Sequence, residues 1–337
     1  MSANDSANAY ARAGVSLEAG EETTKLITKV VKATYNSNVL AGLGAFGGLF
    51  DVSFLKAHDA PVLVASTDGV GTKTKVAVAL NRFDTIGEDI VHHCINDILV
   101  QGATPLFFLD YVAASRLEPQ ITSSIITGVA RACEKTGTVL LGGETAEMPG
   151  VYQEDEFDLV GTVIGVVEKR ELVTGQAAKP GDVVFALMSG GLQTNGFSLA
   201  RSVLTDYDEE LNAQTVGEAL LTPHRHYLSP VRALQKAGIL KGMAHITGGG
   251  LPGNLPRILP EGLGAEIKRD SWTVPPIFSL IQTRGDISED EMYRVFNMGV
   301  GFVCVVNPKD ASRVPKLCPE PVFEVGRVLE GEGVTFV

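Results

Sequence analysis

The chain has 337 residues, of which 45% are hydrophobic and 20% are charged, and its 40 acidic and 28 basic residues give a formal net charge of −12. This length favours two domains, because single hydrophobic cores stop growing at about 250–300 residues. The acidic balance argues against a nucleic-acid or anionic-membrane surface, since those partners require a basic stripe. Phosphate substrates stay possible, because bound magnesium or a helix N-terminus supplies local positive charge.

The sequence carries no signal for export or for membrane insertion. The first ten residues, MSANDSANAY, are polar and lack the apolar core of a signal peptide. No apolar run approaches the ~20 residues that span a bilayer. The four cysteines form no CxxC pair, and we expect them to be reduced structural thiols: Cys94, Cys133, Cys304 and Cys318. We therefore expect a cytoplasmic protein.

The first half of the chain alternates predicted helices and strands. After ten residues that we expect to be disordered, apolar spacing predicts helices over 18–34, 83–100 and 119–135, and strands over 61–68, 106–113, 138–145 and 159–167. The segment 41–50 is too rich in glycine for either element and is predicted to be a loop. This order indicates an α/β domain with layered architecture.

A polar stretch, 168–182, ends in the turn signal Lys-Pro-Gly-Asp and suggests a domain boundary. Beyond it the alternation resumes, with predicted strands over 183–189, 244–247, 301–306 and 323–328 and a helix over 197–204. We therefore predict an N-terminal arm over 1–16, a first domain over 17–170 and a second domain over 171–337.

The segment TDGVGTK, residues 67–73, follows a predicted strand. Its glycines let backbone amides approach an anion, and Lys73 adds a positive charge that we expect to be mobile. The segment is neither a Walker A loop nor a GxGxxG fingerprint, so a tight turn is an equally good interpretation of the glycines alone. Asp68 favours the phosphate loop, because a carboxylate beside phosphates requires a cation such as magnesium between them.

Three further acids lie at the polar ends of apolar elements or inside them. Asp97 follows Asn96 in the second predicted helix, Glu144 lies in GGETAEMPG, and Asp110 interrupts the apolar strand LFFLDYV. Each has an ordinary interpretation as the edge of a helix face, an exposed turn or a paired buried acid. Together with Asp68 they suggest one cation site.

Two glycine-rich loops of the second half are candidate substrate loops. HITGGGLPGN, residues 245–254, leads from a strand into a predicted helix start, which suits phosphate binding on free amides, although a bare turn is the alternative. SGGLQTNGFSLAR offers the neutral groups of Gln193, Thr194 and Asn195, which suit an amide or amidine. Among six histidines, His92, His93, His224 and His226 show no common site, whereas His245 adjoins the triple glycine.

Several long segments occur in one order: YARAGV, GLGAFGGLF, STDGVGTK, INDILVQGATPLFFLDY, GGETAEMPG, HITGGG and FNMGVGF. In these segments the chain resembles the phosphoribosylformylglycinamidine cyclo-ligases, also called aminoimidazole ribonucleotide synthetases, from about Tyr10 to Val328. The resemblance implies a two-domain α/β fold of the α+β type. In this fold the first domains of two subunits join into a barrel-like dimer core, and the second domain is α/β.

The resemblance also implies an activity and a set of site residues. The reaction is the ATP-dependent closure of formylglycinamidine ribonucleotide to aminoimidazole ribonucleotide, with phosphorylation of the formyl oxygen. In the resemblance, magnesium would be held by Asp68, Asp97 and Glu144. ATP would contact Gly69, Val70, Gly71, Thr72 and Lys73, and a mobile loop with Gly44, Phe46 and Gly47 would cover it. The ribonucleotide would face Thr194, Asn195, Gly248, Gly249 and Gly250.

The chain departs from the family pattern at Gln193, where members usually carry a histidine. Glutamine keeps a hydrogen-bonding amide but does not titrate near neutral pH, so we assign Gln193 to substrate binding and leave His245 and Asp110 as candidate catalytic residues. Two other functions stay open. One is an ATP-dependent kinase for a small metabolite, and the other is an idle paralogue that binds nucleotide as a regulator.

Overall fold

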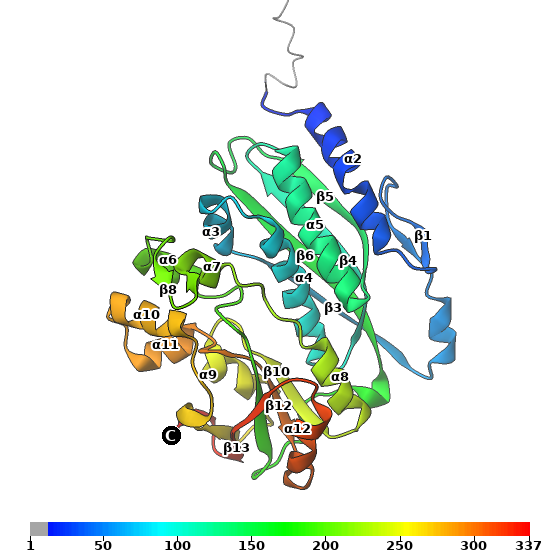
Figure 1. Ribbon diagram of the computed structural model, residues 1–337. Coiled ribbons are helices and arrows are strands. Elements are labelled where there is room, and N and C mark those ends of the chain that lie inside the picture. The colour runs from blue at the N-terminus through cyan, green and yellow to red at the C-terminus, as the bar shows by residue number, and fades with distance from the viewer. Residues whose placement is uncertain (1–12) are drawn as a thin grey trace, which may run out of the picture.

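The computed structural model describes residues 13–337, and each half of the chain builds one of its two large sheets (Figure 1). The predicted disorder of the first ten residues, and most of the predicted arm over 1–16, lie outside the described residues. Among the residues described, no helix is both long and apolar enough to cross a lipid bilayer.

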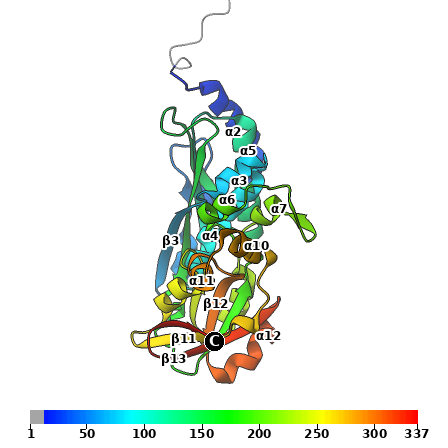
Figure 2. The ribbon, with the colours of Figure 1, turned by 90° about the vertical axis from the view of Figure 1, so that its left-hand side faces the viewer.

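The first sheet has four strands in the order β3-β6-β4-β5. These strands are β3 (Pro61–Gly69), β4 (Thr104–Ala114), β5 (Val139–Glu147) and β6 (Phe157–Glu168). β6 is antiparallel to both of its neighbours, whereas β4 and β5 are parallel and are joined through a helix. Figure 2 shows the helices of this half gathered on one face of the sheet, with the opposite face bare.

The helices of the first half are α2 (Leu17–Ala33), α3 (Lys73–Ala79), α4 (Asp84–Leu99) and α5 (Pro119–Thr136). The backbones of α4 and α5 lie so close together that each helix requires a glycine at the point of contact. A Cβ on Gly87 would lie 2.1 Å from the carbonyl oxygen of Ile125, and a Cβ on Gly128 would lie 1.9 Å from that of Asp84. Two backbones can approach in this way only where neither residue has a side chain.

A short hairpin and a turn of 3-10 helix connect α2 to β3. They are β1 (Val39–Ala41), β2 (Leu49–Phe50) and η1 (Ser53–Ala57). The glycine-rich loop predicted over 41–50 joins β1 to β2. It packs against β5, because a Cβ on Gly48 would lie 2.4 Å from Leu141 Cγ.

The second sheet has six strands in the order β10-β12-β7-β13-β11-β14, all antiparallel except the pair β11–β14. The strands are β7 (Val183–Met188), β10 (Leu240–His245), β11 (Leu263–Ile267), β12 (Val300–Val306), β13 (Val322–Glu330) and β14 (Gly333–Phe336). All seven residues of β12 are buried, as their unbroken apolar sequence requires. A separate small hairpin pairs β8 (Glu210–Leu211) with β9 (Gln214–Thr215).

The helices of the second half are short. They are η2 (Lys169–Glu171), α6 (Phe197–Val203), α7 (Val216–Leu220), α8 (Leu228–Lys236), α9 (Gly250–Asn254), η3 (Leu255–Ile258), η4 (Arg269–Ser271), α10 (Pro276–Gly285), α11 (Glu289–Val295), η5 (Pro308–Arg313) and α12 (Val314–Leu317).

The two halves meet along α4, which is buried along nearly its whole length. One side of the helix packs on the first sheet through Ile90 and Cys94, and its last residue, Leu99, joins the core formed by Phe185 and Tyr227 of the second half. A helix on the protein surface places its polar residues on the face that contacts solvent. In α4 most of the polar residues are buried together with the apolar ones. These polar side chains therefore face the junction between the halves.

The predicted fold class is confirmed, since both halves mix helices and sheets in layers. The three predicted helices of the first half coincide with α2, α4 and α5 to within one residue at each end. The strand predicted over 244–247 is wrong in position, because β10 ends at His245 and the next residues already form the glycine turn.

Candidate active site between the two halves

A cavity of about 830 Å³ lies between the first sheet and the second half. β3 and α4 form one wall, and β10, η3 and the glycine turn after β10 form the other. The polar side chains on its lining are Ser66, Asp68, His93, Asp97, Gln101, Thr174, His245, Thr247, Asn254 and Arg257. The cavity thus joins residues nearly 200 positions apart in the sequence.

Asp68 and Asp97 approach one imidazole in this cavity. Asp68 Oδ2 lies 2.9 Å from His93 Nε2, and Asp97 Oδ2, one helical turn after His93, lies 3.7 Å from the same nitrogen. Ser66 Oγ donates to Asp97 Oδ2 at 3.0 Å. Burial raises the pKa of both carboxyls, but hydrogen bonds from His93 to Asp68 and from His245 to Asp97 outweigh it and lower both pKa values. Both acids are therefore carboxylates at neutral pH.

His245 ends β10 and places its imidazole beside the same acids. Its Nδ1 lies 2.8 Å from Asp97 Oδ1, and its Nε2 lies 3.0 Å from Nε2 of His224. Burial lowers the pKa of His245, although the hydrogen bond to Asp97 opposes this effect. The predicted site residues Asp68, Asp97 and His245 are thus brought together.

The two loops of the second half also meet at this place. Thr194 Oγ1 lies 2.7 Å from His93 Nδ1, and a Cβ on Gly248 would lie 3.3 Å from Asn195 Oδ1. Gly249 has a φ of +93°, a left-handed conformation that glycine adopts without strain. Asn254 fixes the turn, because its Nδ2 donates to the carbonyl oxygens of Gly248 and Gly250 at 3.1 and 2.9 Å.

The loop after β3 has the expected glycine conformation, but its lysine does not have the expected role. Gly71 has a φ of +68°, and Thr72 Oγ1 lies 3.1 Å from Ser198 Oγ. Lys73 is completely buried: its Nζ lies 2.7 Å from Asp89 Oδ2 and donates to the Thr222 carbonyl at 2.9 Å. The expected mobile charge is therefore wrong, because the ammonium is neutralised inside the protein.

Within the described chain, the four predicted acids do not form one cation site. Glu144 lies on β5, at the opposite edge of the sheet from Asp68 on β3, so three strand spacings of ~4.8 Å separate their backbones. Asp110 is in register with Asp68 across Gly161 of the intervening strand, two spacings away. Asp110 and Glu144 line a separate small cavity beside α2.

Asp110 differs from the other acids in its charge state. Its side chain is buried and the hydrogen bonds described for it come from its own backbone, so burial raises its pKa to about 7. It does not contact His245, and the structure gives no support to its predicted catalytic role.

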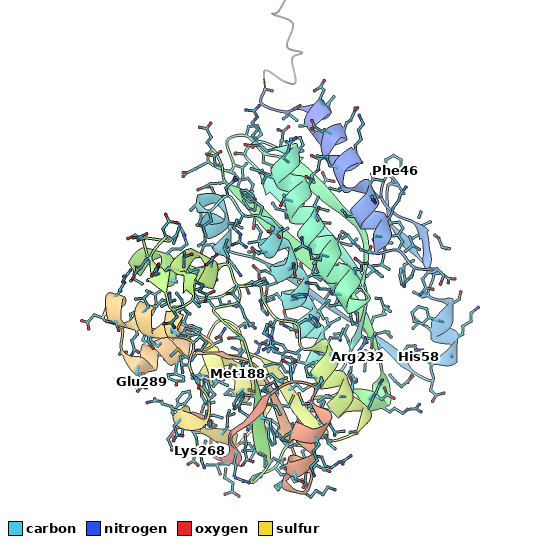
Figure 3. The ribbon with its side chains drawn as sticks, in the orientation of Figure 1. Phe46, His58, Met188, Arg232, Lys268 and Glu289 are labelled. Atoms are coloured by element: carbon cyan, nitrogen blue, oxygen red, sulfur yellow. The ribbon has the colours of Figure 1, made fainter. Side chains whose placement is uncertain are left out.

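The glycine loop with Gly44, Phe46 and Gly47 does not cover the cavity in this structure. Phe46 is fully exposed and lies beside β1 at the outer edge of the first half (Figure 3). The cavity between the halves instead opens beside β3, at the other edge of the sheet.

Comparison with known proteins identifies the relatives of this chain. The pattern of the AIR synthase related protein N-terminal domain matches residues 51–167, and that of the corresponding C-terminal domain matches residues 179–337. A phosphoribosylformylglycinamidine cyclo-ligase of Bacillus pumilus (strain SAFR-032) is 50% identical over 339 residues, which cover 97% of each chain. The chain belongs to the phosphoribosylformylglycinamidine cyclo-ligase family. The resemblance predicted from the sequence segments is therefore confirmed.

Solved structures share the fold of this cyclo-ligase family member at lower identity. Thiamine-monophosphate kinase from Stenotrophomonas maltophilia K279a superposes with a TM-score of 0.67 and 16% identity, covering 92% of this chain and 95% of that one. The hydrogenase maturation protein HypE in complex with ATP superposes with a TM-score of 0.68 and 16% identity, covering 91% and 86%. At this identity the likeness concerns the fold alone.

Gln193, the departure from the cyclo-ligase pattern, is buried with 2% of its surface exposed. Its Nε2 donates to the Tyr227 hydroxyl at 2.8 Å, and its Oε1 has no hydrogen-bond partner. The side chain is absent from the lining of the cavity. The predicted substrate contact of Gln193 is therefore not seen, whereas its neighbour Thr194 does reach the site through His93.

Sequence reasoning missed three site residues of this family member. His93 and His224 were set aside because histidine spacing alone gave no common site, and Arg257 was not considered. The separation of four between His93 and Asp97 is a signal that was available, because residues i and i+4 share one helix face. No local signal pointed to His224, which reaches the site only through the packing of the second half on α4.

Proposed function

We propose that this chain catalyses the reaction for which its relatives are named, the ATP-dependent ring closure of formylglycinamidine ribonucleotide. The observation that carries the proposal is the whole-length identity to cyclo-ligases, together with a cavity that unites Asp68, Asp97 and His245. An amide-like formyl oxygen is a poor leaving group. Transfer of the γ-phosphoryl group to that oxygen lets the ring nitrogen attack the carbon, and phosphate then leaves with the oxygen. The products are aminoimidazole ribonucleotide, ADP and phosphate.

Magnesium fits the acids at the end of β3. Mg²⁺ prefers oxygen ligands and is usually bound through one or two carboxylates plus substrate phosphates. Asp68 and Asp97 supply two carboxylates, and Ser66 adds a hydroxyl beside them. When bound, the ion would neutralise charge on the transferred phosphoryl group. We assign Asp68 and Asp97 to this role, whereas Glu144 of the same chain lies too far away to join them.

The phosphate contacts are assigned to backbone amides and one arginine. The loop of Gly69, Val70, Gly71 and Thr72 follows Asp68 directly, so its backbone lies beside the proposed magnesium ligands. Since Lys73 is buried in an ion pair, positive charge must come from elsewhere. Arg257 lines the cavity on the opposite wall and contacts Asn254 of the glycine turn at 3.1 Å. We assign Arg257 to a phosphate of the substrates.

The ribonucleotide is assigned to the wall formed by the second half. Asn195 and the turn of Gly248, Gly249 and Gly250 approach each other there. Amide and hydroxyl oxygens in this wall can accept hydrogen bonds from the amidine N–H groups of the substrate. His245 remains the proposed catalytic residue, because it lines the cavity and Asp97 positions its ring.

We propose a homodimer that acts in the cytoplasm. The bare face of the first sheet exposes apolar side chains, and Leu63 on β3 is 62% exposed. Phe107, Leu109, Tyr111 and Ile164 on neighbouring strands alternate with buried residues and are only partly buried. Sheet-on-sheet packing against a second copy would cover this face, which supports the barrel-like dimer core.

A coupled assay of ADP release tests the activity. We expect release to depend on formylglycinamidine ribonucleotide and the product to be aminoimidazole ribonucleotide, identified by mass spectrometry. A phosphorylated metabolite without ring closure would instead indicate a kinase. ATP binding without any turnover would indicate a regulatory paralogue, and either result would overturn the proposal.

A further inference from the structure

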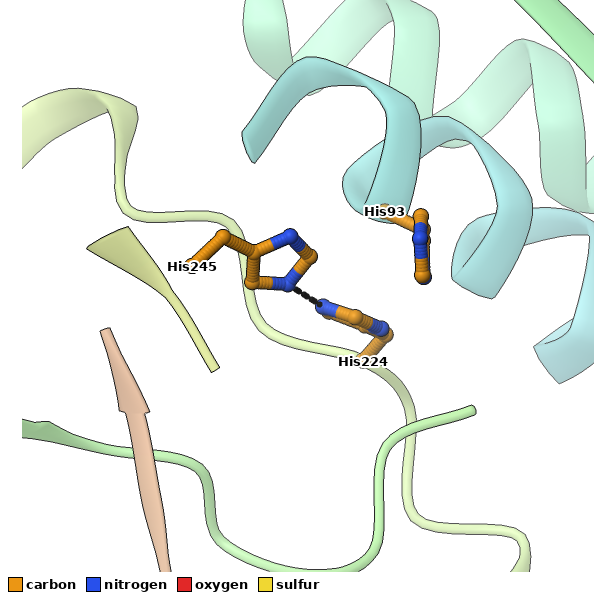
Figure 4. Close-up of side chains that lie close together, drawn as sticks. All are labelled: His93, His224 and His245. Carbon is orange, nitrogen blue, oxygen red and sulfur yellow. Dashed lines mark hydrogen bonds between the residues drawn. The ribbon is translucent and has the colours of Figure 1, made fainter. Parts of the chain in front are cut away.

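Three buried histidines come together from three distant segments of the chain (Figure 4). His93 lies on α4, His224 lies between α7 and α8, and His245 ends β10. Their ring centroids are 5.2, 5.0 and 5.0 Å apart, which makes a nearly equilateral triangle. One nitrogen from each ring lies within 4.8 Å of a nitrogen of each of the others. This grouping has the dimensions of a metal site.

The hydrogen bonds of His245 leave its Nε2 with a lone pair. Its Nδ1 lies 2.8 Å from Asp97 Oδ1. A carboxylate only accepts hydrogen bonds, so Nδ1 carries the proton. In a neutral imidazole the other nitrogen is then an acceptor, and this Nε2 points at His224.

The hydrogen bonds of His224 lead to the same result. Asn96 Nδ2 lies 3.2 Å from His224 Nε2. The orientation of this amide is fixed, because Asn96 Oδ1 accepts from the Tyr227 amide at 3.0 Å and Nδ2 donates to the Arg225 carbonyl at 2.8 Å. Asn96 can therefore donate to His224 Nε2 in the tautomer that leaves this nitrogen its lone pair.

In these tautomers two nitrogens with lone pairs face each other at 3.0 Å, along the hydrogen-bond contact that Figure 4 marks with a dashed line. In the other tautomer of His224 the contact is an N–H···N hydrogen bond, and a metal ion can replace that proton by accepting a lone pair from each ring. Two nitrogen ligands at about 2.0–2.1 Å from a tetrahedral zinc ion are separated by roughly 3.3 Å, close to the observed spacing.

We propose that His93, His224 and His245 bind one divalent transition-metal ion of the Zn²⁺ type. Three imidazoles form the ligand set of an open zinc site. The hydrogen bond from His245 Nδ1 to Asp97 is the outer contact that orients a ligating histidine. Both nitrogens of His93 have partners, Asp68 and Thr194, so His93 would give up one of these contacts to bind the ion.

Magnesium does not compete, because it requires oxygen ligands. The four cysteines do not compete either, because among the residues that the structure describes none of them belongs to a group of metal-ligating side chains. The proposed reaction requires no such ion, and an ion on Nε2 of His245 would occupy the free nitrogen of the residue that is proposed to be catalytic.

Metal binding here would link the two halves of the chain. His93 belongs to the first half, whereas His224 and His245 belong to the second. An ion held by ligands from both halves binds the folded chain and not the unfolded one, so the melting temperature should rise with its free concentration.

The test uses the untagged full chain, freed of metal with a chelator. ZnCl₂ is titrated by calorimetry, and the melting temperature is measured with and without zinc. We expect one zinc ion per chain and a zinc-dependent rise in melting temperature. His224→Gln and His245→Gln should each weaken binding at least tenfold and remove that rise. His58→Gln, at a partly exposed histidine that pairs with Glu168 outside the cluster, is the matched control and should bind as the wild type does.

Absence of saturable zinc binding in the wild type would overturn the proposal, as would equal weakening by His58→Gln. Far-UV circular dichroism checks that the buried-site variants fold. X-ray absorption at the zinc edge tests the wild type without any variant. Three imidazole nitrogens are expected, and an oxygen-only or sulfur-containing ligand set would exclude this site.

Discussion

The ammonium of Lys73 and the carboxylate of Asp89 form an ion pair of 2.7 Å in which neither side chain is exposed. Lys73→Met would leave the Asp89 charge buried without its partner. We expect this variant to lose about 3–5 kcal/mol of unfolding free energy, measured by urea denaturation. The double variant Lys73→Met/Asp89→Asn removes both charges and should recover part of the loss. If the double variant bound ATP much more weakly than the wild type, Lys73 would have a phosphate role after all.

Asp68 is proposed to hold magnesium, so Asp68→Asn should reduce turnover about 10²–10³-fold and raise the magnesium concentration needed for half-maximal rate. ADP release measured across a magnesium titration gives both quantities. Asp59→Asn changes an exposed carboxylate paired with Arg170 and is the control. An unchanged magnesium dependence in Asp68→Asn would contradict the assignment.

Asp110 links stability to pH, because burial raises its pKa to about 7 from the ordinary value of 3.8. The folded chain keeps this proton between those values, while the unfolded chain loses it. Stability is therefore greatest below pH 3.8 with respect to this group and falls as pH rises towards 7. Asp110→Asn removes the effect, so the variant should gain up to about 4 kcal/mol over the wild type at pH 8 and nothing near pH 4.

The same variant tests the catalytic role predicted for Asp110 from the sequence. Denaturation at several pH values gives the stability, and the ADP assay gives the activity. Retained activity is expected, because Asp110 lines a cavity apart from His245. A loss of activity in a well-folded variant would restore the sequence-based assignment.

Two helical glycines should respond oppositely to alanine. A Cβ on Gly20 of α2 meets nothing within 4 Å, so Gly20→Ala should raise the unfolding free energy by up to about 1 kcal/mol. A Cβ on Gly87 of α4 would lie 2.1 Å from the Ile125 carbonyl oxygen, so Gly87→Ala should lower it by about 1–3 kcal/mol. Equal effects in thermal denaturation would mean that α4 and α5 are not in the contact described.

Gln193→His should leave activity unchanged or higher. The imidazole can replace the amide as donor to the Tyr227 hydroxyl, and it restores the residue type usual in the family. Steady-state kinetics of the ring closure measure the effect. A large loss would show that glutamine itself supports the reaction, and Gln193→Leu, which removes the donor to Tyr227, would then separate hydrogen bonding from packing.

The sequence predicted the elements of the first half because their hydrophobic periods are long and regular, as in α4 and α5. It also named Asp68 and Asp97 for a cation site and His245 as a catalytic candidate, and the structure brings these three residues together. The prediction that Glu144 and Asp110 belong to the same cation site was wrong. An acid at the end of an apolar strand can be recognised from the sequence, but the position of that strand within the sheet cannot. The order β3-β6-β4-β5 separates these acids and is not encoded in any local pattern.

Lys73 and His224 show a second reason for failure. A lysine after a glycine loop and a histidine in an irregular segment are both expected in solvent, yet each is buried by residues more than 100 positions away along the chain. Burial of this kind depends on how the second half packs on α4. Spacing along the sequence contains no information about that packing.

The position of α4 between the two halves affects how the protein unfolds. Asn96 holds the backbone of Arg225 and Tyr227, and Leu99 completes the core beneath them, so this helix belongs to both halves. Removing either half would strip α4 of one of its two packing surfaces. The chain should therefore melt in one cooperative transition, and a fragment ending near residue 170 should not be a stable protein when produced alone.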